Sequence, residues 1–204
     1  MIESKFCYMR WEGLVLLLEL VETALRDTAK ISSYLGPLMA KYKMQQRIFG
    51  LIVDSSQSDK ITPVTSKETS IALEVLQKAQ KLYSVNPHSK GFAALIRLVV
   101  ETALPQVQMP ALRFLAAVLA KNEFCRKSFR KSGGVETLGK WVKEQRGAAK
   151  VINVRATLDV LDLGSRLMVQ LAENEADRQK LATIFGAKEL SDLIDSANSS
   201  AIKS

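Results

Sequence analysis

Cysteine, histidine and aromatic side chains are scarce in this sequence of 204 residues, which holds two cysteines, one histidine and 6% aromatic residues. Cys7 and Cys125 lack the number and spacing of a disulfide framework or a zinc site, and free cysteine usually packs as a small apolar side chain. His88 stands in the turn Asn86–Ser89, with no cysteine or carboxylate within several residues. We therefore expect no metal site and no catalytic cysteine or histidine.

The sequence also lacks a long uninterrupted apolar segment. The apolar run Leu14–Leu18 is followed by Glu19 and Glu22, and no charged leader with a small-residue cleavage site precedes it. This pattern predicts a buried helix instead of a signal peptide or a membrane-spanning segment. We expect a soluble intracellular protein, cytoplasmic or nuclear.

Motifs that carry chemistry are missing as well. We find no glycine-rich dinucleotide loop, no P-loop, no HExxH zinc motif and no GxSxG nucleophile motif. Gly133–Gly134 indicates the end of a helix before it indicates a phosphate loop, and Asp159 and Asp162 suit a solvated helix edge. The sequence therefore predicts neither enzymatic activity nor a cofactor.

Apolar residues at helical spacing are abundant, and the hydrophobic content of 47% is enough for a sizeable core without disulfides. No segment has the alternation of a β-strand. The range 31–53 is predicted to be helical with a bend at Gly36–Pro37, another helix is predicted to begin near Pro110, and the polar range 54–65 is predicted to be a loop. We expect an all-α chain of about ten helices, over 11–30, 31–53, 66–84, 92–104, 110–121, 135–145, 153–173 and 188–197, with two short ones after Asn122 and Asn174.

One short segment occurs twice. The first copy starts at Asn122 with the pattern Asn-Glu-x-x-Arg and ends at Gly133–Gly134, and the second starts at Asn174 and ends at Gly186. In each copy the asparagine can accept a hydrogen bond from the first free N–H groups of a short helix, and the glycine can end that helix. Each copy follows a long apolar helix and precedes another. Such a unit cannot bury its apolar face alone, so stacked copies would share one core.

The repeated unit resembles the armadillo repeat, in which a short helix ends at glycine and leads into two longer antiparallel helices. The closest match is Gly133–Leu138, a second is Gly186–Leu190, and a degenerate third is Asn86–Leu95. The asparagines of the three matches lie 36 and 52 residues apart (122 − 86 and 174 − 122). These two spacings lie on either side of the repeat length of about 40–47 residues that is usual for this class. HEAT repeats and a non-repeating helical bundle stay open as alternatives. The resemblance implies a right-handed α-solenoid in one domain over residues 1–204, with an N-terminal helical pair (11–53), a loop (54–65), the repeats (66–197) and a tail (198–204).

The resemblance also implies where a partner would bind. In armadillo repeats the third helix lines a concave groove, and in some members a Trp and an Asn four residues apart hold an extended basic peptide. Here Arg113 and Arg166 stand at the Trp position, Ala117 and Gln170 stand at the Asn position, and Lys81 belongs to the equivalent pair one repeat earlier. A basic peptide is therefore disfavoured. Arginines at these places favour an acidic or phosphorylated segment, because a guanidinium binds carboxylate or phosphate in bidentate geometry.

The net charge of +8 is concentrated in residues 121–155, which hold ten basic and three acidic residues and so contribute +7 (10 − 3). Arg126, Lys127, Arg130 and Lys131 lie on one side of the short helix after Asn122, whereas the second copy has the mixed sequence Asp177–Lys180. We therefore predict that the caps belong to the fold and that the fold does not require these basic residues. The basic residues of this region form either a solvated face or a binding site. We call the candidate binding residues among them the basic ridge: Arg126, Arg130, Lys131 and Lys140.

The leading hypothesis is a non-catalytic protein-interaction module that binds an acidic or helical segment through the groove (Lys81, Arg113, Arg166 and Gln170) and the basic ridge. One alternative is a nucleic-acid or anionic-membrane adaptor that uses the ridge. Nucleic acid is the less favoured partner, because Phe124, Phe129 and Trp141 have a spacing that suits burial instead of base stacking. A second alternative is a regulatory or chaperone-like subunit that docks through one end of the solenoid, which exposed apolar side chains on the first or last helix would favour.

Overall fold

The computed structural model describes residues 2–26, 31–57, 63–80, 87, 89–102, 104–149 and 155–201. These residues contain eleven α-helices and no β-strand, which confirms the all-α prediction with one helix more than the ten expected. The helices are α1 (Ile2–Arg26), α2 (Ile31–Lys41), α3 (Met44–Gln57), α4 (Pro63–Ala79), α5 (Ser89–Val100), α6 (Pro105–Lys121), α7 (Glu123–Lys131), α8 (Gly134–Ala149), α9 (Arg155–Ala172), α10 (Glu175–Phe185) and α11 (Ala187–Ala201).

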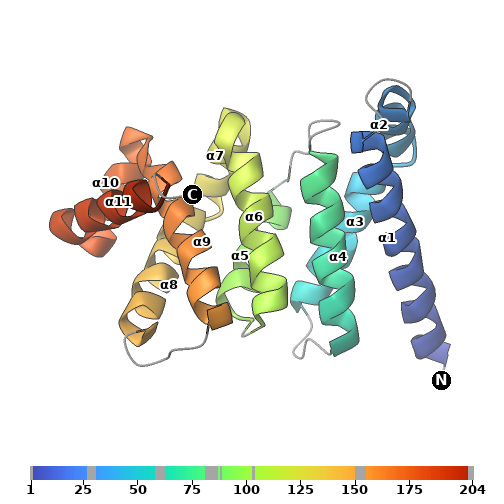
Figure 1. Cartoon of the computed structure of the whole chain (residues 1–204), viewed down its shortest axis with the longest axis horizontal. Coiled ribbons are helices and arrows are strands. Elements are labelled where there is room, and N and C mark those ends of the chain that lie inside the picture. The colour runs from blue at the N-terminus through green and yellow to red at the C-terminus, as the bar shows by residue number, and fades with distance from the viewer. Residues whose placement is uncertain are drawn as a thin grey trace.

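The longer helices stand in two rows (Figure 1). A front row consists of α1, α4, α6 and α9, each in contact with the next, and a rear row consists of α3, α5 and α8. Three helices lie at the edges: α2 contacts α1 and α3, α7 contacts α5, α6 and α8, and α10 contacts α8 and α9. α11 packs on α9 and α10. Helices therefore contact only their neighbours in the stack, from α1 at one end to α10 and α11 at the other.

One main core runs through both rows, from Leu14 on α1 to Leu193 on α11. Phe92 and Phe129 are buried in it, and their rings meet edge to face with centroids 5.6 Å apart, an arrangement that aromatic pairs prefer. Trp141 is also buried, as predicted. A smaller second cluster joins α1, α2 and α4 and consists of Val21, Ala24, Leu35, Met39 and Ala79.

The structure corrects the predicted bend at Gly36–Pro37. The chain instead breaks at Tyr42–Lys43, where Lys43 has a φ of 50°, and Pro37 lies inside α2. The break has a tertiary cause, because α2 packs in the second cluster whereas the buried residues of α3 belong to the main core. The chain must change direction between the two helices, and no glycine or proline marks the place.

The structure also corrects the start predicted at Pro110. α6 begins at Pro105, so this residue occupies the first helical position, where a missing N–H loses no intrahelical bond, and Pro110 lies inside the helix. The polar range 54–65 is only partly a loop, because α3 continues to Gln57 and α4 begins at Pro63. Residues 58–62, and the end of the helix predicted for 66–84, lie outside the described residues.

The repeated segment has the predicted caps in both copies. Asn122 Oδ1 accepts a hydrogen bond from the Cys125 N–H (3.2 Å), and Asn174 Oδ1 accepts one from the Ala176 N–H (3.1 Å). The glycines that follow the two short helices have positive φ, 72° at Gly133 and 83° at Gly186, which a side chain would disfavour. The sequence pattern therefore identified both ends of α7 and α10 correctly.

The arginine of each copy has a structural role that the sequence analysis missed. Arg126 Nε donates to the Leu119 carbonyl (2.6 Å) at the end of α6, and Arg178 Nε donates to the Ala172 carbonyl (2.8 Å) at the end of α9. The last carbonyl groups of a helix have no partner within it. Each arginine therefore caps the C-terminal end of the helix that precedes its own, and we say that it closes that helix. The prediction that the fold does not need the basic residues of the first copy is therefore wrong for Arg126.

The close packing of α7 on the start of α8 predicts a cost for any side chain at Gly134. A Cβ there would lie 2.3 Å from the buried ring of Phe129, so we expect Gly134→Ala to destabilise the protein by about 1–3 kcal/mol. Gly147→Ala is the matched control on the same helix, with no atom within 4 Å of its Cβ and an expected gain of up to about 1 kcal/mol. Urea unfolding followed by circular dichroism measures both, and equal effects would contradict the packing argument.

Candidate functional site

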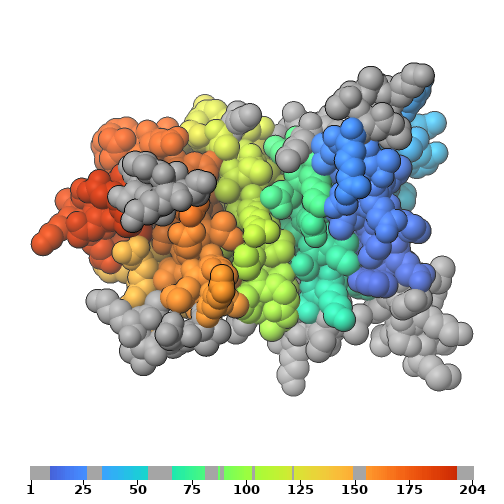
Figure 2. All heavy atoms as spheres, in the orientation of Figure 1, coloured from blue at the N-terminus to red at the C-terminus, as the bar shows by residue number. Residues whose placement is uncertain are grey.

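The two groove arginines lie on neighbouring helices of the front row. Both are exposed, Arg113 on α6 and Arg166 on α9. Because α4 and α9 flank α6 and because α5 lies behind it, an exposed α6 side chain points out of the front. Figure 2 shows the front row as one broad, continuous face. Arg113 and Arg166 each lie one turn before a residue of the hydrogen bond between Gln170 on α9 and Ala116 on α6, so both arginines lie beside the contact between these two helices.

Arg113 and Arg166 differ in whether a carboxylate of the protein already pairs with the guanidinium. Arg166 Nε lies 2.9 Å from Asp162 Oδ2, one turn earlier on α9, with both side chains about half exposed. Such surface pairs contribute only about 0–1 kcal/mol, so a partner can displace Asp162 at little cost. No acidic side chain in the described ranges pairs with Arg113. Arg113 is therefore a guanidinium on this face with no competing carboxylate among the described residues.

The other two groove candidates give less to a binding surface. The Gln170 side-chain amide donates to the Ala116 carbonyl (3.1 Å), so this side chain ties α9 to α6. Lys81 lies outside the described residues. Of the four predicted groove residues, the structure places two arginines on one open face and uses Gln170 for packing between helices.

The basic ridge divides into arginines that the fold uses and lysines that stay in solvent. Arg126 closes α6 and Arg130 binds two carboxylates, whereas Lys131 and Lys140 are exposed. The prediction that the fold does not need these side chains is thus wrong for Arg130 as well. Lys140 lies one turn from Glu136 on α8 and helps to lower the pKa of that carboxyl.

Arg130 links α7 to α10. Its Nε donates to Asp177 Oδ1 at 2.7 Å, and its Nη1 lies 3.2 Å from Glu123 Oε1. Asp177 is fully buried and the Arg130 side chain is 18% exposed, so the hydrogen bond to Asp177 raises the pKa of the guanidinium although burial opposes this. A buried carboxylate is costly unless a cation and hydrogen bonds compensate it. Arg130 is the residue whose charge compensates the buried carboxylate of Asp177.

A second ion pair also holds α10, in this case to α8. Lys180 on α10 donates to Glu136 on α8. Burial raises the pKa of Glu136, but the hydrogen bond from Lys180 and the nearby charges outweigh it, so the net pKa is lowered. The carboxylate form is therefore favoured in the folded protein, and its contribution to stability is lost as the pH falls through this lowered pKa.

Most of the exposed large apolar side chains of the described residues lie at one end of the stack. Leu16 (66% exposed) and Leu20 are on α1, and Tyr34 (77%), Leu38 and Tyr42 are on or directly after α2. These helices have no neighbour beyond them in the stack (Figure 1). Contiguous exposed apolar surface is typical of sites that bind another protein.

The structure corrects the expected burial of Phe124, which is 65% exposed on α7. Cys125 and Phe129, four residues apart, set the buried face of this helix, and Phe124 lies about 100° from Cys125 around the axis. The sequence held part of this signal, because Cys125 and Phe129, one turn apart, already form an apolar side on this short and otherwise charged helix. Phe129 and Trp141 are buried as expected.

Two findings concern the nucleophilic and metal-binding side chains of the described residues. Burial raises the pKa of the Cys125 thiol to about 11, so this cysteine stays a neutral thiol near neutral pH. The described residues hold no group of three His, Cys, Asp or Glu side chains that could bind a metal ion. His88 and the Cys7 side chain lie outside what the structure describes.

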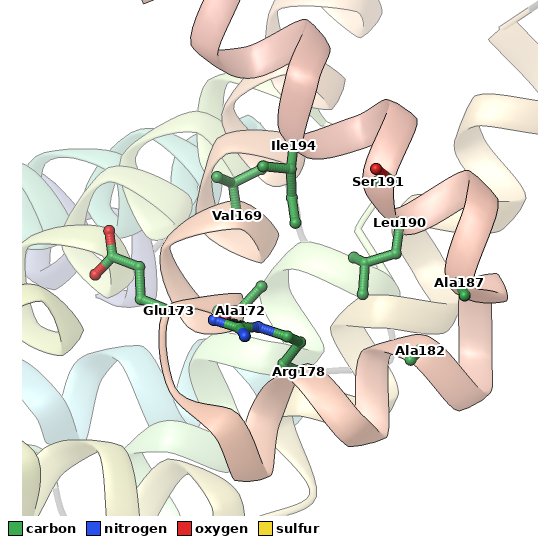
Figure 3. A pocket seen from close by; sticks show the side chains of 9 residues that line it. All are labelled: Val169, Ala172, Glu173, Arg178, Ala182, Ala187, Leu190, Ser191 and Ile194. Carbon is green, nitrogen blue, oxygen red and sulfur yellow. Dashed lines mark hydrogen bonds between the residues drawn. The ribbon is translucent and has the colours of Figure 1, made fainter.

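A hollow of about 570 Å³ lies between the end of α9, α10 and α11 (Figure 3). Its wall is mainly apolar, and its charged side chains are Glu173 and Arg178. Arg178 donates to the Ala172 carbonyl and lies 3.3 Å from Glu175, so its guanidinium already has partners within the protein. The lining residues are Val169, Ala172, Glu173, Arg178, Ala182, Ala187, Leu190, Ser191 and Ile194.

Comparisons of the chain with family models, with curated proteins and with solved structures find no match in any of the three. None of the helices in the described ranges has the length and hydropathy needed to cross a lipid bilayer.

The buried pair between α7 and α10 leads to a stability prediction. Arg130→Met leaves the carboxylate of Asp177 buried without its cation, so we expect a loss of about 3–5 kcal/mol in urea unfolding. Adding Asp177→Leu to this variant removes the stranded charge and should recover most of the loss. Lys131→Met, one residue further on α7 and exposed, is the control and should change stability by less than about 0.5 kcal/mol. A similar small effect for Arg130→Met would show that the pair contributes little.

Proposed function

We propose that this chain is a non-catalytic protein-interaction module with an armadillo-like α-solenoid fold. The proposal is supported by the order of its helices, because the short, capped α7 leads into α8 and α9, and the short, capped α10 leads into α11. It is also supported by packing in which helices contact only their neighbours in the stack. This order and packing are what a solenoid of three-helix repeats requires.

The binding surface in this proposal is the front face of α6 and α9, and its ligand is an acidic or phosphorylated protein segment. The observation that carries the proposal is the exposed Arg113, which has no carboxylate partner among the described residues. Arg166 on the adjacent helix adds a second guanidinium once it leaves Asp162. Two planar cations on one face favour carboxylate or phosphate groups spaced along a segment that crosses from α6 to α9.

Reversing both charges tests this surface. We expect Arg113→Glu/Arg166→Glu to reduce partner capture from cell extract at least tenfold, measured by quantitative mass spectrometry against the wild-type protein. The matched control is Lys90→Glu/Arg97→Glu, which makes the same charge change with two exposed residues of the rear helix α5. Partners that bind both variants and the wild type equally would eliminate the front face as the binding site.

A second candidate function is supported by the exposed apolar side chains of α1 and α2, and it is docking of the α1 end onto a larger assembly as a regulatory or chaperone-like subunit. Leu16 and Leu20 lie one turn apart on α1, so they form one apolar stripe. In this case the front face need not bind anything, and the partner surface would be apolar.

Polar substitutions at the α1 stripe distinguish the two candidates. For end docking, we expect Leu16→Gln/Leu20→Gln to abolish capture of partners that Arg113→Glu/Arg166→Glu retains. Leu158→Gln on α9 is the control, since Leu158 is also an exposed leucine but lies in the front row. Retention of every partner by the Leu16/Leu20 variant would rule out docking through this stripe.

A further inference from the structure

The short helices α7 and α10 occupy equivalent places, so each shows what the other needs in order to fold. Each follows a front-row helix, contacts the rear-row helix of the preceding unit, and leads directly into the next helix. With the two asparagines 52 positions apart (174 − 122), the capping asparagine and the arginine that closes the preceding helix match between the two copies at that offset. Asn122 and Asn174 cap the helices, and Arg126 and Arg178 close the preceding ones.

The outward side chains of the two helices differ. α7 exposes Phe124, Lys127 and Lys131, whereas α10 exposes Ala176, Gln179 and Thr183 at the matching positions. Because α10 forms the same helix with one small apolar and two neutral polar residues, the fold does not require an aromatic ring and two cations at these places. A single exposed apolar side chain is common on protein surfaces, but here the ring, which is 65% exposed, lies beside two cations that α10 also lacks.

The three side chains lie together on α7. At about 100° per residue they span about 60° of the helix circumference, on the side opposite the buried Cys125 and Phe129. No described carboxylate pairs with Lys127 or Lys131, and Glu123, the acid of this helix, is bound to Arg130. The two lysines also repel one another slightly, as like charges one turn apart do. The result is a small surface with two free cations beside an exposed phenyl ring, which we call the α7 patch.

We propose that the α7 patch docks an acidic protein segment in which two acidic side chains precede an apolar one at alternate positions. The rise between Lys127 and Lys131 is about 6 Å, close to the about 6.6 Å between alternate side chains of an extended chain. Two carboxylates of such a segment can therefore meet the two lysines, and an apolar side chain two residues further on covers Phe124. This inference depends on the proposed function, because it gives the protein-binding module a second contact and names its chemistry.

The composition of the patch favours a protein segment over nucleic acid or a membrane surface. The two arginines that would have extended its charge are committed, Arg126 to the end of α6 and Arg130 to Asp177. Two lysines and one ring match a short segment, whereas a nucleic-acid site needs a longer track of cations and several stacking rings. A nine-residue helix with one exposed aromatic ring is also a small anchor for a bilayer.

The test uses a fluorescein-labelled peptide with the core Glu-Ser-Glu-Ser-Leu, titrated with the full chain at physiological salt and followed by fluorescence anisotropy. We expect Phe124→Ala/Lys127→Gln/Lys131→Thr to raise Kd at least tenfold while the melting temperature changes little, since all three side chains are exposed. Phe124→Ala alone should raise Kd severalfold. The matched control, Lys90→Gln/Lys188→Gln, removes two exposed lysines elsewhere and should leave Kd within twofold of the wild-type value.

Three results would overturn the inference. The first is equal weakening by the control variant, which would make the binding a nonspecific effect of net charge. The second is unchanged peptide binding by the triple variant. The third is tighter binding of single-stranded RNA or of phosphatidylserine vesicles than of the peptide, if the triple variant also loses it.

The Arg113→Glu/Arg166→Glu variant separates this inference from the proposed function. Loss of the peptide in that variant, with normal binding by the triple variant, contradicts the α7 patch and leaves the front-face proposal standing. Loss in the triple variant alone supports the patch, whatever the front face binds.

Discussion

The long front-row helices α6 and α9 each end at a turn into a short helix, and hydrogen bonds must satisfy their last carbonyl groups there. α6 and α9 meet this constraint in the same way. An arginine one turn into the next short helix reaches back to close the long helix, while an asparagine between the two opens the short one. The turn that joins two neighbouring helices is thereby fixed from both sides. The same turn recurs after α6 and after α9, and the packing of α7 and α10 against the rear row follows from it.

This constraint also decides which charges a partner can meet. Arg126 and Arg130 are held by backbone carbonyls and by carboxylates, for which the several donors of a planar guanidinium are well suited. Lys127 and Lys131 are on the same helix and stay exposed. A count of cations along the sequence therefore overstates the free positive charge of this region, because two of the four on α7 neutralise or close parts of the molecule itself.

The sequence predicted the features that depend on neighbouring residues and missed those that depend on distant ones. Helical periodicity located the helices, and the Asn and Gly caps marked both ends of α7 and α10. The break at Tyr42–Lys43 was missed because it lies within one polar stretch of the sequence. Its cause is that α2 packs in the second cluster whereas α3 packs in the main core. The pair Arg130–Asp177 was missed because its residues are 47 positions apart on different helices. Of the candidate site, the resemblance to the armadillo repeat predicted that Arg113 and Arg166 share one face, but it could not show that Gln170 is used for packing.

Exposed apolar side chains lie at the α1 end of the stack and on α7, and they are not equally strong evidence for a binding surface. α1 is the first helix of the front row and contacts only α2 and α4, so an exposed Leu16 follows in part from its position at the end of the stack. Phe124 lies on a helix with neighbours on three sides, and the equivalent helix α10 has alanine at that position. α7 is not at an end of the stack, and α10 shows that the fold does not require a ring at this position. Phe124 is therefore the stronger sign of a binding surface, although the α1 end has the larger number of exposed apolar side chains.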